Sequence, residues 1–215
     1  MIGLSSSYFA SKNFSIYDSV KNISELGFNL AEIGAAHKFE ENLFETTKKI
    51  KKDFPELQFT IHGLFPPWKE NFWFNPALGL TPRNKKVIDN LFRAAEILEA
   101  EIISFHPGFL GVVEYRKNPK GYAEAVLAKK LNKEKATKKL LEVLDYVVKK
   151  NNSIGIKIAI ENIDSNEDNA LVTGNDFQKI FNQFPSLSLL FDLGHAIADN
   201  TINSLLELKE KIIQI

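Results

Sequence analysis

The chain has 215 residues, of which 44% are hydrophobic and 25% are charged, and its 27 basic and 27 acidic side chains cancel. This composition excludes a disordered or fibrous protein, and the balanced charge argues against a protein that mainly coats nucleic acid or anionic membrane. The absence of cysteine excludes disulfides, thiolate metal sites and cysteine nucleophiles.

Short β-rich runs alternate with longer amphipathic runs in the first half of the chain. Strands are expected at 2–5, 30–34, 57–62 and 102–105, and helices at 19–26, 40–52 and 82–98. Asp18 is expected to cap the first helix and Gly27 to end it. Thr81 followed by Pro82 is typical of a helix start.

The same alternation continues in the second half. Helices are expected at 133–150, 176–184 and 201–211, and strands at 156–160 and 187–191, with 212–215 as the beginning of a seventh strand. The dense lysines between 117 and 139 alternate with glutamate and apolar residues. They are therefore interpreted as a solvated helix face.

Strands that alternate with helices predict a parallel sheet with helices outside it. We expect an α/β fold, a (β/α)8 TIM barrel formed by one domain over residues 1–215, with an open doubly wound sheet as the alternative. A complete barrel needs about 250 residues, so we expect this one to be truncated near strand seven. No apolar run reaches the roughly 18 residues of a membrane span and no leader is recognised, which makes the cytoplasm the expected compartment.

Ionisable side chains stand at the ends of the predicted strands. His62, His106 and His195 end or closely follow a strand, and so do Glu161 and Asp192. The carboxyl ends of parallel barrel strands share one face, where active sites are built. Three imidazoles and two carboxylates on that face predict a site for a divalent metal such as zinc or manganese.

Each of these residues also has a purely structural interpretation. A histidine beside a strand is often a hydrogen-bonded loop residue, and Asp192 is also placed to cap a helix with His195 nearby. Glu161 follows four apolar strand residues, where a carboxylate is costly to bury unless it is paired or binds a metal. Together the five residues favour a metal site, whereas His37, in a loop among lysines and glutamates, is expected at the surface.

Other catalytic patterns are absent from the sequence, because no phosphate-binding glycine loop and no Gly-x-Ser-x-Gly elbow occurs. The segment 65–74 is rich in aromatic residues and contains Trp68 and Trp73. Two interpretations stay open for it. It stacks on a sugar ring or a base, or it fills a barrel mouth or a subunit interface.

Five segments, taken in order, resemble the xylose-isomerase-like TIM barrels, a superfamily of sugar-phosphate isomerases/epimerases and endonuclease IV-type apurinic endonucleases. They are Phe59-Thr-Ile-His62, Phe74-Asn-Pro-Ala with the later Arg83, Ile103-Ser-Phe-His-Pro-Gly108, Ile158-Ala-Ile-Glu-Asn162 and Leu190-Phe-Asp-Leu-Gly-His-Ala196. Each motif is short, but five on successive predicted strands span essentially the whole chain.

The resemblance implies a metal centre whose ligands are His62, His106, Glu161, Asp192 and His195, with zinc or manganese as the ion and magnesium or cobalt as alternatives. It implies a sugar or sugar-phosphate isomerase or epimerase that moves a proton through a metal-stabilised enediolate. Glu161 and His195 are then the catalytic residues, and Trp68, Trp73 and Asn162 are expected to bind the substrate.

Two other functions remain open. The endonuclease branch implies a zinc cluster, abasic DNA as the substrate and His195 as a ligand, although zero net charge disfavours duplex binding. A degenerate barrel without catalysis is the second alternative, because both branches take further ligands from strands seven and eight. We expect the chain with its interrupted sheet to self-associate, to pair with a complementing C-terminal chain or to be marginally stable, and we expect no membrane partner.

Overall fold

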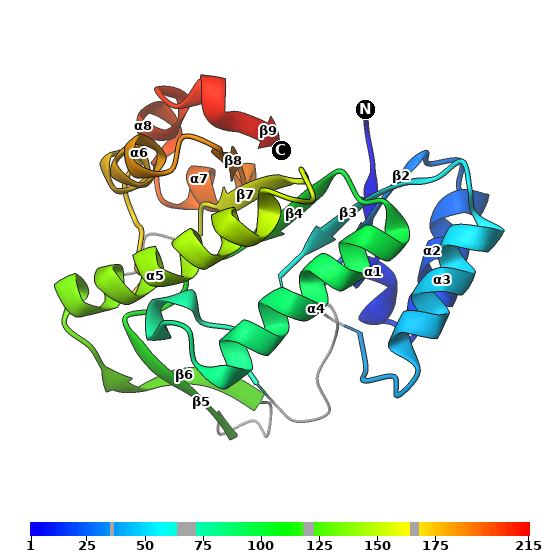
Figure 1. Cartoon of the computed structure of the whole chain (residues 1–215), viewed down its shortest axis with the longest axis horizontal. Helices are drawn as coiled ribbons and strands as arrows, with labels where there is room; N and C mark the ends of the chain where they lie inside the picture. The colour runs from blue at the N-terminus through cyan, green and yellow to red at the C-terminus, as the bar shows by residue number, and fades with distance from the viewer. Residues whose placement is uncertain (35–36, 64–71, 118–122, 164–167) are drawn as a thin grey trace. The chain divides into compact units, whose positions relative to one another are not determined.

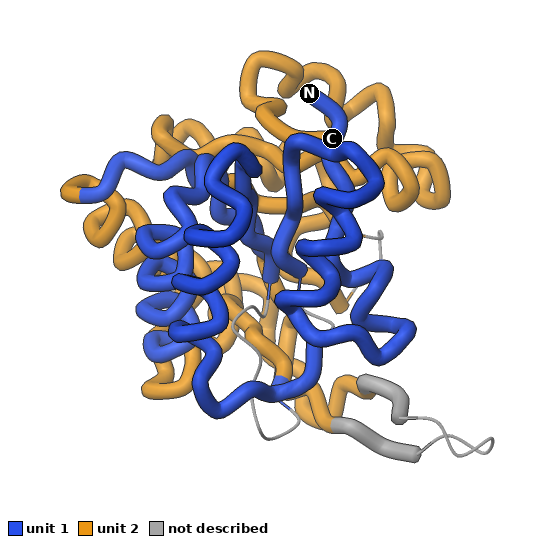
Figure 2. Tube along the Cα trace, turned by 90° about the vertical axis from the view of Figure 1, so that its right-hand side faces the viewer, with its two compact units in different colours: residues 1–72, 85–105, 154–158 blue, residues 73–84, 106–153, 159–215 orange. Residues whose placement is uncertain are grey.

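The structure is a computed structural model that describes residues 1–34, 37–63, 72–117, 123–163 and 168–215 (Figure 1). The chain forms two compact units (Figure 2). Unit 1 contains residues 1–72, 85–105 and 154–158, and unit 2 contains residues 73–84, 106–153 and 159–215. The single domain expected over residues 1–215 stays a prediction.

Unit 1 is built on parallel strands that follow the chain order. They are β1 (Leu4–Ser5), β2 (Leu30–Ile33), β3 (Gln58–His62) and β4 (Ile102–Phe105). In register, Ala31 pairs with Leu4 on one side and Phe59 on the other, and Ile61 pairs with Ile103. The backbone N–H of Lys157 donates to the carbonyl of Glu101, which places the start of β7 (Lys157–Glu161) beside β4.

Helices connect these strands: α1 (Ser7–Ala10), α2 (Ile16–Glu25), α3 (Leu43–Asp53) and α4 (Pro82–Leu98), whose first turn belongs to unit 2. The expected cap of α2 is wrong, because Ser15 Oγ accepts the backbone N–H of Asp18 and the helix starts earlier. Gly27 has a positive φ of 83°, as a C-terminal glycine requires, and Thr81 Oγ1 accepts the N–H of Asn84.

Unit 2 contains the rest of β7 with β8 (Leu187–Leu190) and β9 (Ile212–Gln214). The N–H of Asn162 donates to the Leu190 carbonyl, and β8 pairs with β9 in parallel. Strand β7 has residues in both units. The strand order is β1-β2-β3-β4-β7-β8-β9. The strand expected to begin at Ile212 is therefore confirmed.

The helices of unit 2 are η1 (Pro76–Leu78), α5 (Lys133–Asn151), α6 (Gly174–Gln183), α7 (Leu193–Ala198), α8 (Ile202–Leu206) and η2 (Lys209–Lys211). Leu140, Val143, Leu144 and Val147 recur at helical spacing on α5 and are all buried. In the described part of the chain, none of the helices combines the length and apolarity that crossing a bilayer demands.

An antiparallel hairpin follows β4 where the sequence predicted a helix face. Strand β5 (Gly111–Lys117) pairs with β6 (Ala123–Lys130), and α5 begins only after the Asn132 cap. The helix prediction is therefore wrong for the lysines of both strands, while Lys120 lies outside the described residues. Lysine density does not distinguish the two structures, since both a helix face and an edge strand tolerate lysine.

Candidate metal centre

His106 directly follows β4, in a segment of unit 2 that the side chain of Asn75 holds in place. Asn75 is 1% exposed, and its Oδ1 accepts the N–H groups of Ala77 and Phe109 at 3.1 and 3.0 Å. Its Nδ2 donates to the carbonyls of Phe109 and Gly111 at 3.1 and 2.8 Å. Three of these hydrogen bonds therefore fix the backbone that follows His106, and the fourth, from Ala77, holds the turn of Asn75 itself.

Asn75 is in turn held in place by Asn84, a residue of the first turn of α4. Asn84 Nδ2 donates to the carbonyls of Asn75 and Gly79 at 2.8 and 2.7 Å. The sequence contained Asn75 and Pro76 in a family motif but assigned Asn75 no role. An asparagine before a proline is a common turn signal, and nothing in it indicated bonds to residues more than thirty positions away.

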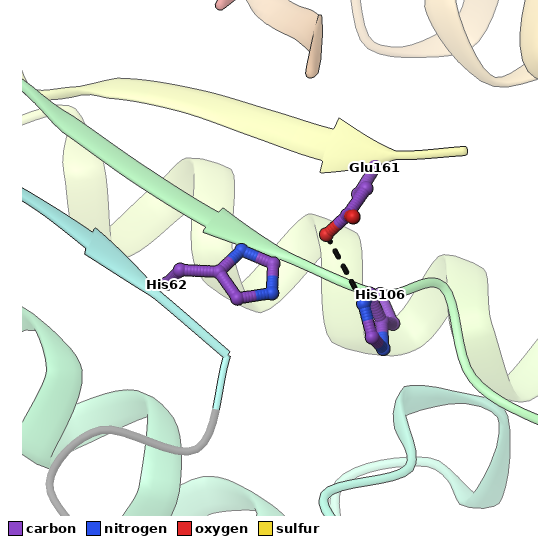
Figure 3. A group of neighbouring side chains, drawn as sticks. All are labelled: His62, His106 and Glu161. Carbon is purple, nitrogen blue, oxygen red and sulfur yellow. Dashed lines mark ion pairs between the residues drawn. The ribbon is translucent and has the colours of Figure 1, made fainter. Parts of the chain in front are cut away.

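Glu161 ends β7 and is the buried carboxylate of the site. It is 6% exposed, and its Oε2 lies 3.1 Å from Nε2 of His106, which is partly exposed (Figure 3). The strand positions the carboxylate because Ile158, Ala159 and Ile160, which precede it, are all buried. His106 therefore lies beside the buried carboxylate, and whether Glu161 is compensated by pairing or by a metal, the two ways that the sequence left open, stays a prediction.

Asp192 and His195 follow β8, and both lie close to Glu161. One ligand atom from each of these three side chains lies within 4.8 Å of the others. Asp192 is also the N-cap of α7, since its Oδ1 accepts the backbone N–H of His195 at 2.7 Å. Asp192 can therefore be both a helix cap and a candidate metal ligand. Its Oδ1 caps α7, and its carboxylate also lies near Glu161 and His195.

Unit 2 therefore collects four of the five predicted ligands, His106, Glu161, Asp192 and His195. Two carboxylates and two imidazoles suit zinc, manganese or a related divalent ion, because such ions take both oxygen and nitrogen ligands. The buried Glu161 fits this assignment, since a metal compensates a desolvated negative charge. The metal itself, its identity and its ligands remain predictions.

The fifth predicted ligand, His62, belongs to unit 1. It is the last residue of β3 (Figure 3) and is half-buried. Its Nδ1 lies 3.0 Å from Oγ of the fully buried Ser104. This hydrogen bond orients the imidazole ring at the end of its strand. The role of His62 as a metal ligand stays a prediction.

The predicted substrate-binding residues are only partly described. Trp73 lies in unit 2, partly exposed, with its ring in edge contact with Phe109 at 5.6 Å between centroids. Trp68 lies outside the described residues. Both polar groups of the Asn162 side chain bond to the backbone of Asp192, at 2.8 and 2.9 Å. Substrate binding by Trp73 and Asn162 stays a prediction.

His37 was expected at the surface, and this is wrong. It is 7% exposed, and its Nε2 lies 2.9 Å from Oγ of the buried Ser6. Burial lowers the pKa of His37 below its ordinary value of 6.5, against smaller raising effects of the Phe14 backbone and the Glu40 carboxylate. His37 is therefore a core residue of unit 1 that favours the neutral imidazole.

Comparisons with known proteins agree with this geometry. Residues 20–215 match the family model described as xylose isomerase-like TIM barrel. None of the curated proteins matches the chain.

Similar solved structures include a D-tagatose 3-epimerase-like protein, with a TM-score of 0.67, 22% identity, and coverage of 99% of this chain and 73% of that one. A D-psicose 3-epimerase solved with D-fructose has a TM-score of 0.66 and 14% identity, covering 94% and 68%. A family 2 AP endonuclease from Brucella melitensis has a TM-score of 0.67 and 15% identity, covering 91% and 70%. At these identities the likeness establishes the shared fold.

Proposed function

Because the chain belongs to the xylose isomerase-like TIM barrel family, we propose that it is a divalent-metal-dependent isomerase or epimerase of sugars or sugar phosphates. The observation that carries this proposal is the approach of Glu161, Asp192 and His195 to within 4.8 Å, with His106 on the same carboxylate. The sugar epimerases among the similar structures support a sugar as the substrate.

His106, Glu161, Asp192 and His195 hold the metal in this proposal. His62, which ends β3 in unit 1, is the fifth ligand that we propose, as the family resemblance of its segment implies. A divalent ion, when bound, supplies Lewis-acid stabilisation of negative charge on the sugar oxygens.

Glu161 is the residue that we assign to proton transfer. Its carboxylate takes the proton from the sugar carbon next to the carbonyl, and its Oε2 lies 3.1 Å from Nε2 of His106, which we propose as a metal ligand. His195 orients a sugar hydroxyl. In an isomerisation the carboxylate returns the proton to the neighbouring carbon on the same face while the hydroxyl proton passes from one sugar oxygen to the other, whereas an epimerisation returns a proton to the same carbon from the opposite face and needs a second group there.

Solvent exchange tests this proposal even while the exact sugar is unidentified. A panel of ketoses, aldoses and their phosphates is incubated with the manganese- or zinc-loaded protein in deuterium oxide, and carbon-bound deuterium is measured by NMR. We expect exchange in at least one sugar, lost with chelator and in Glu161→Gln but kept in Glu207→Gln, which changes an exposed carboxylate of the same unit. A folded, metal-loaded protein that exchanges no member of the panel would contradict the proposal.

A second candidate is an abasic-site endonuclease of the same family. The sequence keeps a histidine at the end of both β3 and β4, and one similar structure is a family 2 AP endonuclease. Nicking of a duplex that contains an abasic site, abolished by chelator, would select this function. If the folded protein neither nicks this duplex nor exchanges deuterium into a sugar, the remaining alternative is a barrel without catalytic activity.

A further inference from the structure

Asn162 binds the backbone of a candidate ligand through both ends of its side-chain amide. It follows Glu161 at the end of β7 and is 2% exposed. Its Oδ1 accepts the backbone N–H of Asp192 at 2.8 Å, and its Nδ2 donates to the backbone carbonyl of Asp192 at 2.9 Å. An amide offers a donor and an acceptor side by side, so this reciprocal pair fixes both the position and the orientation of the Asp192 backbone.

The constraint passes on from Asp192 to His195. Asp192 Oδ1 accepts the backbone N–H of His195 at 2.7 Å, which fixes the carboxylate of Asp192 and the first turn of α7 against each other. Asn162 therefore acts on two candidate ligands, on Asp192 directly and on His195 through Asp192. Its own neighbour in sequence, Glu161, is the third member of the group.

This arrangement has a physical consequence before any metal binds. Glu161 and Asp192 are both carboxylates, and like charges at short distance repel each other and favour separation. A neutral, buried amide that anchors the Asp192 backbone beside the strand of Glu161 opposes that separation. Binding then requires less ordering of the ligands, which increases affinity.

We propose that Asn162 is a positioning residue that preorganises Asp192 and His195 for metal binding in the metal-free protein. This inference rests on the proposed metal centre and deepens it, and it gives Asn162 a role that does not require contact with the substrate.

The first test measures hydrogen exchange of the Asp192 backbone amide in the metal-free protein. We expect Asn162→Ala to accelerate this exchange about tenfold, the size of effect that the loss of one hydrogen bond produces. Asn162→Asp should accelerate it as well, because its second oxygen would face the Asp192 carbonyl oxygen and its charge would add to two carboxylates. Asn203→Ala, at an exposed asparagine on α8, is the matched control and should leave it unchanged. An Asp192 amide that exchanges equally in wild type and Asn162→Ala overturns the inference.

The second test measures affinity for cobalt or manganese by titration, with the visible spectrum of bound cobalt as a report on the ligand geometry. We expect Asn162→Ala to weaken binding about 10–100-fold, as the loss of groups that orient ligands does elsewhere, and to change the cobalt spectrum. Unchanged affinity and spectrum in the folded variant would overturn the inference.

These tests also separate this inference from the proposed function. A wild-type protein that binds no metal contradicts both. A wild-type protein that binds metal, and loses affinity in Asn162→Ala, but exchanges no sugar proton supports the positioning role and contradicts only the sugar chemistry.

Discussion

A carboxylate at the end of a buried strand is stable only when its charge is compensated, and the buried Glu161 carboxylate lies 3.1 Å from Nε2 of His106, among candidate ligands for a cation. The same desolvation makes it a strong ligand for a cation. Structural stability and metal binding therefore depend on one side chain.

Replacement of Glu161 by glutamine should separate these two roles. Glutamine keeps the shape and loses the charge, so we predict a folded protein whose metal affinity falls by about 100-fold or more, beyond the range seen for groups that only orient ligands. Titration of manganese or zinc into wild type, Glu161→Gln and the exposed Glu207→Gln measures this effect. Equal metal affinities of the wild type and Glu161→Gln would show that Glu161 is not a metal ligand.

His37 predicts a pH dependence of stability in unit 1. Its pKa in the folded protein is lowered by burial, so as the pH falls below about 6.5 the unfolded chain takes up a proton that the folded chain resists. We predict that the free energy of unfolding decreases from pH 7 toward pH 5, and less steeply in His37→Gln. Parallel pH profiles from denaturant titrations of the two proteins would contradict this assignment.

The sequence placed each candidate ligand at the end of a strand that is recognisable from its apolar run, and the structure brings Glu161, Asp192 and His195 close together, while their role as ligands stays a prediction. The sequence did not indicate that His37 is buried, because its neighbours in sequence are charged, while Ser6, its hydrogen-bond partner, lies 31 positions away. The reciprocal bonds of Asn162 to Asp192 are hidden for the same reason, at a separation of 30 positions.

Helix α6 of unit 2 illustrates how an element is stabilised at its start. The Thr173 side chain accepts the N–H of Asp176, and the Asp176 carboxylate accepts the N–H groups of Val172 and Thr173. Burial acts to raise the pKa of Asp176, but these N–H groups together with Lys133 outweigh it and lower the pKa below 3.8.

We predict that Thr173→Ala costs about 1 kcal/mol of stability, the usual value for a lost cap. Thr201 stands at the same position of α8 but makes no side-chain cap hydrogen bond, so Thr201→Ala is the matched control and should cost less. Chemical denaturation of both variants measures the difference, and equal losses would show that the capping box contributes nothing.

The loop after β4 depends on Gly108, which has a φ of 96° and approaches Asn75 closely. A Cβ at Gly108 would lie 2.2 Å from Asn75 Oδ1, whereas a Cβ at Gly155, with a φ of 80°, would meet nothing within 4 Å. We predict a loss of about 1–2 kcal/mol for Gly155→Ala from backbone strain alone, and about 1–3 kcal/mol more for Gly108→Ala. Equal losses on denaturation would contradict the role of Asn75 as an anchor.

At the level of elements, local patterns predicted most helices and parallel strands but not the β5–β6 hairpin. Parallel strands between helices have a distinctive apolar run, and caps such as Thr81 and Asn132 mark helix starts. The hairpin strands contain charged and apolar residues in a pattern that a helix also accommodates. Pairing between the two strands, rather than the local sequence, determined the outcome.

At the scale of the whole molecule, the alternation of strands and helices was sufficient to predict the family fold. Strand β9 pairs with β8 and stands at the end of the strand order. An unpaired strand edge favours association. We predict that the chain self-associates, binds a second chain or is marginally stable, which sedimentation velocity over a range of concentrations and thermal unfolding would detect, and a monomer with a high melting temperature would contradict this.

The most direct test of the metal centre is the metal content of the purified chain, measured by elemental analysis after incubation with manganese or zinc and removal of the excess. We predict at least about one tightly held equivalent per chain, as the two-carboxylate, two-imidazole set requires, and its loss in Asp192→Asn. A folded wild-type chain that retains no metal would contradict the centre, and with it the proposed chemistry.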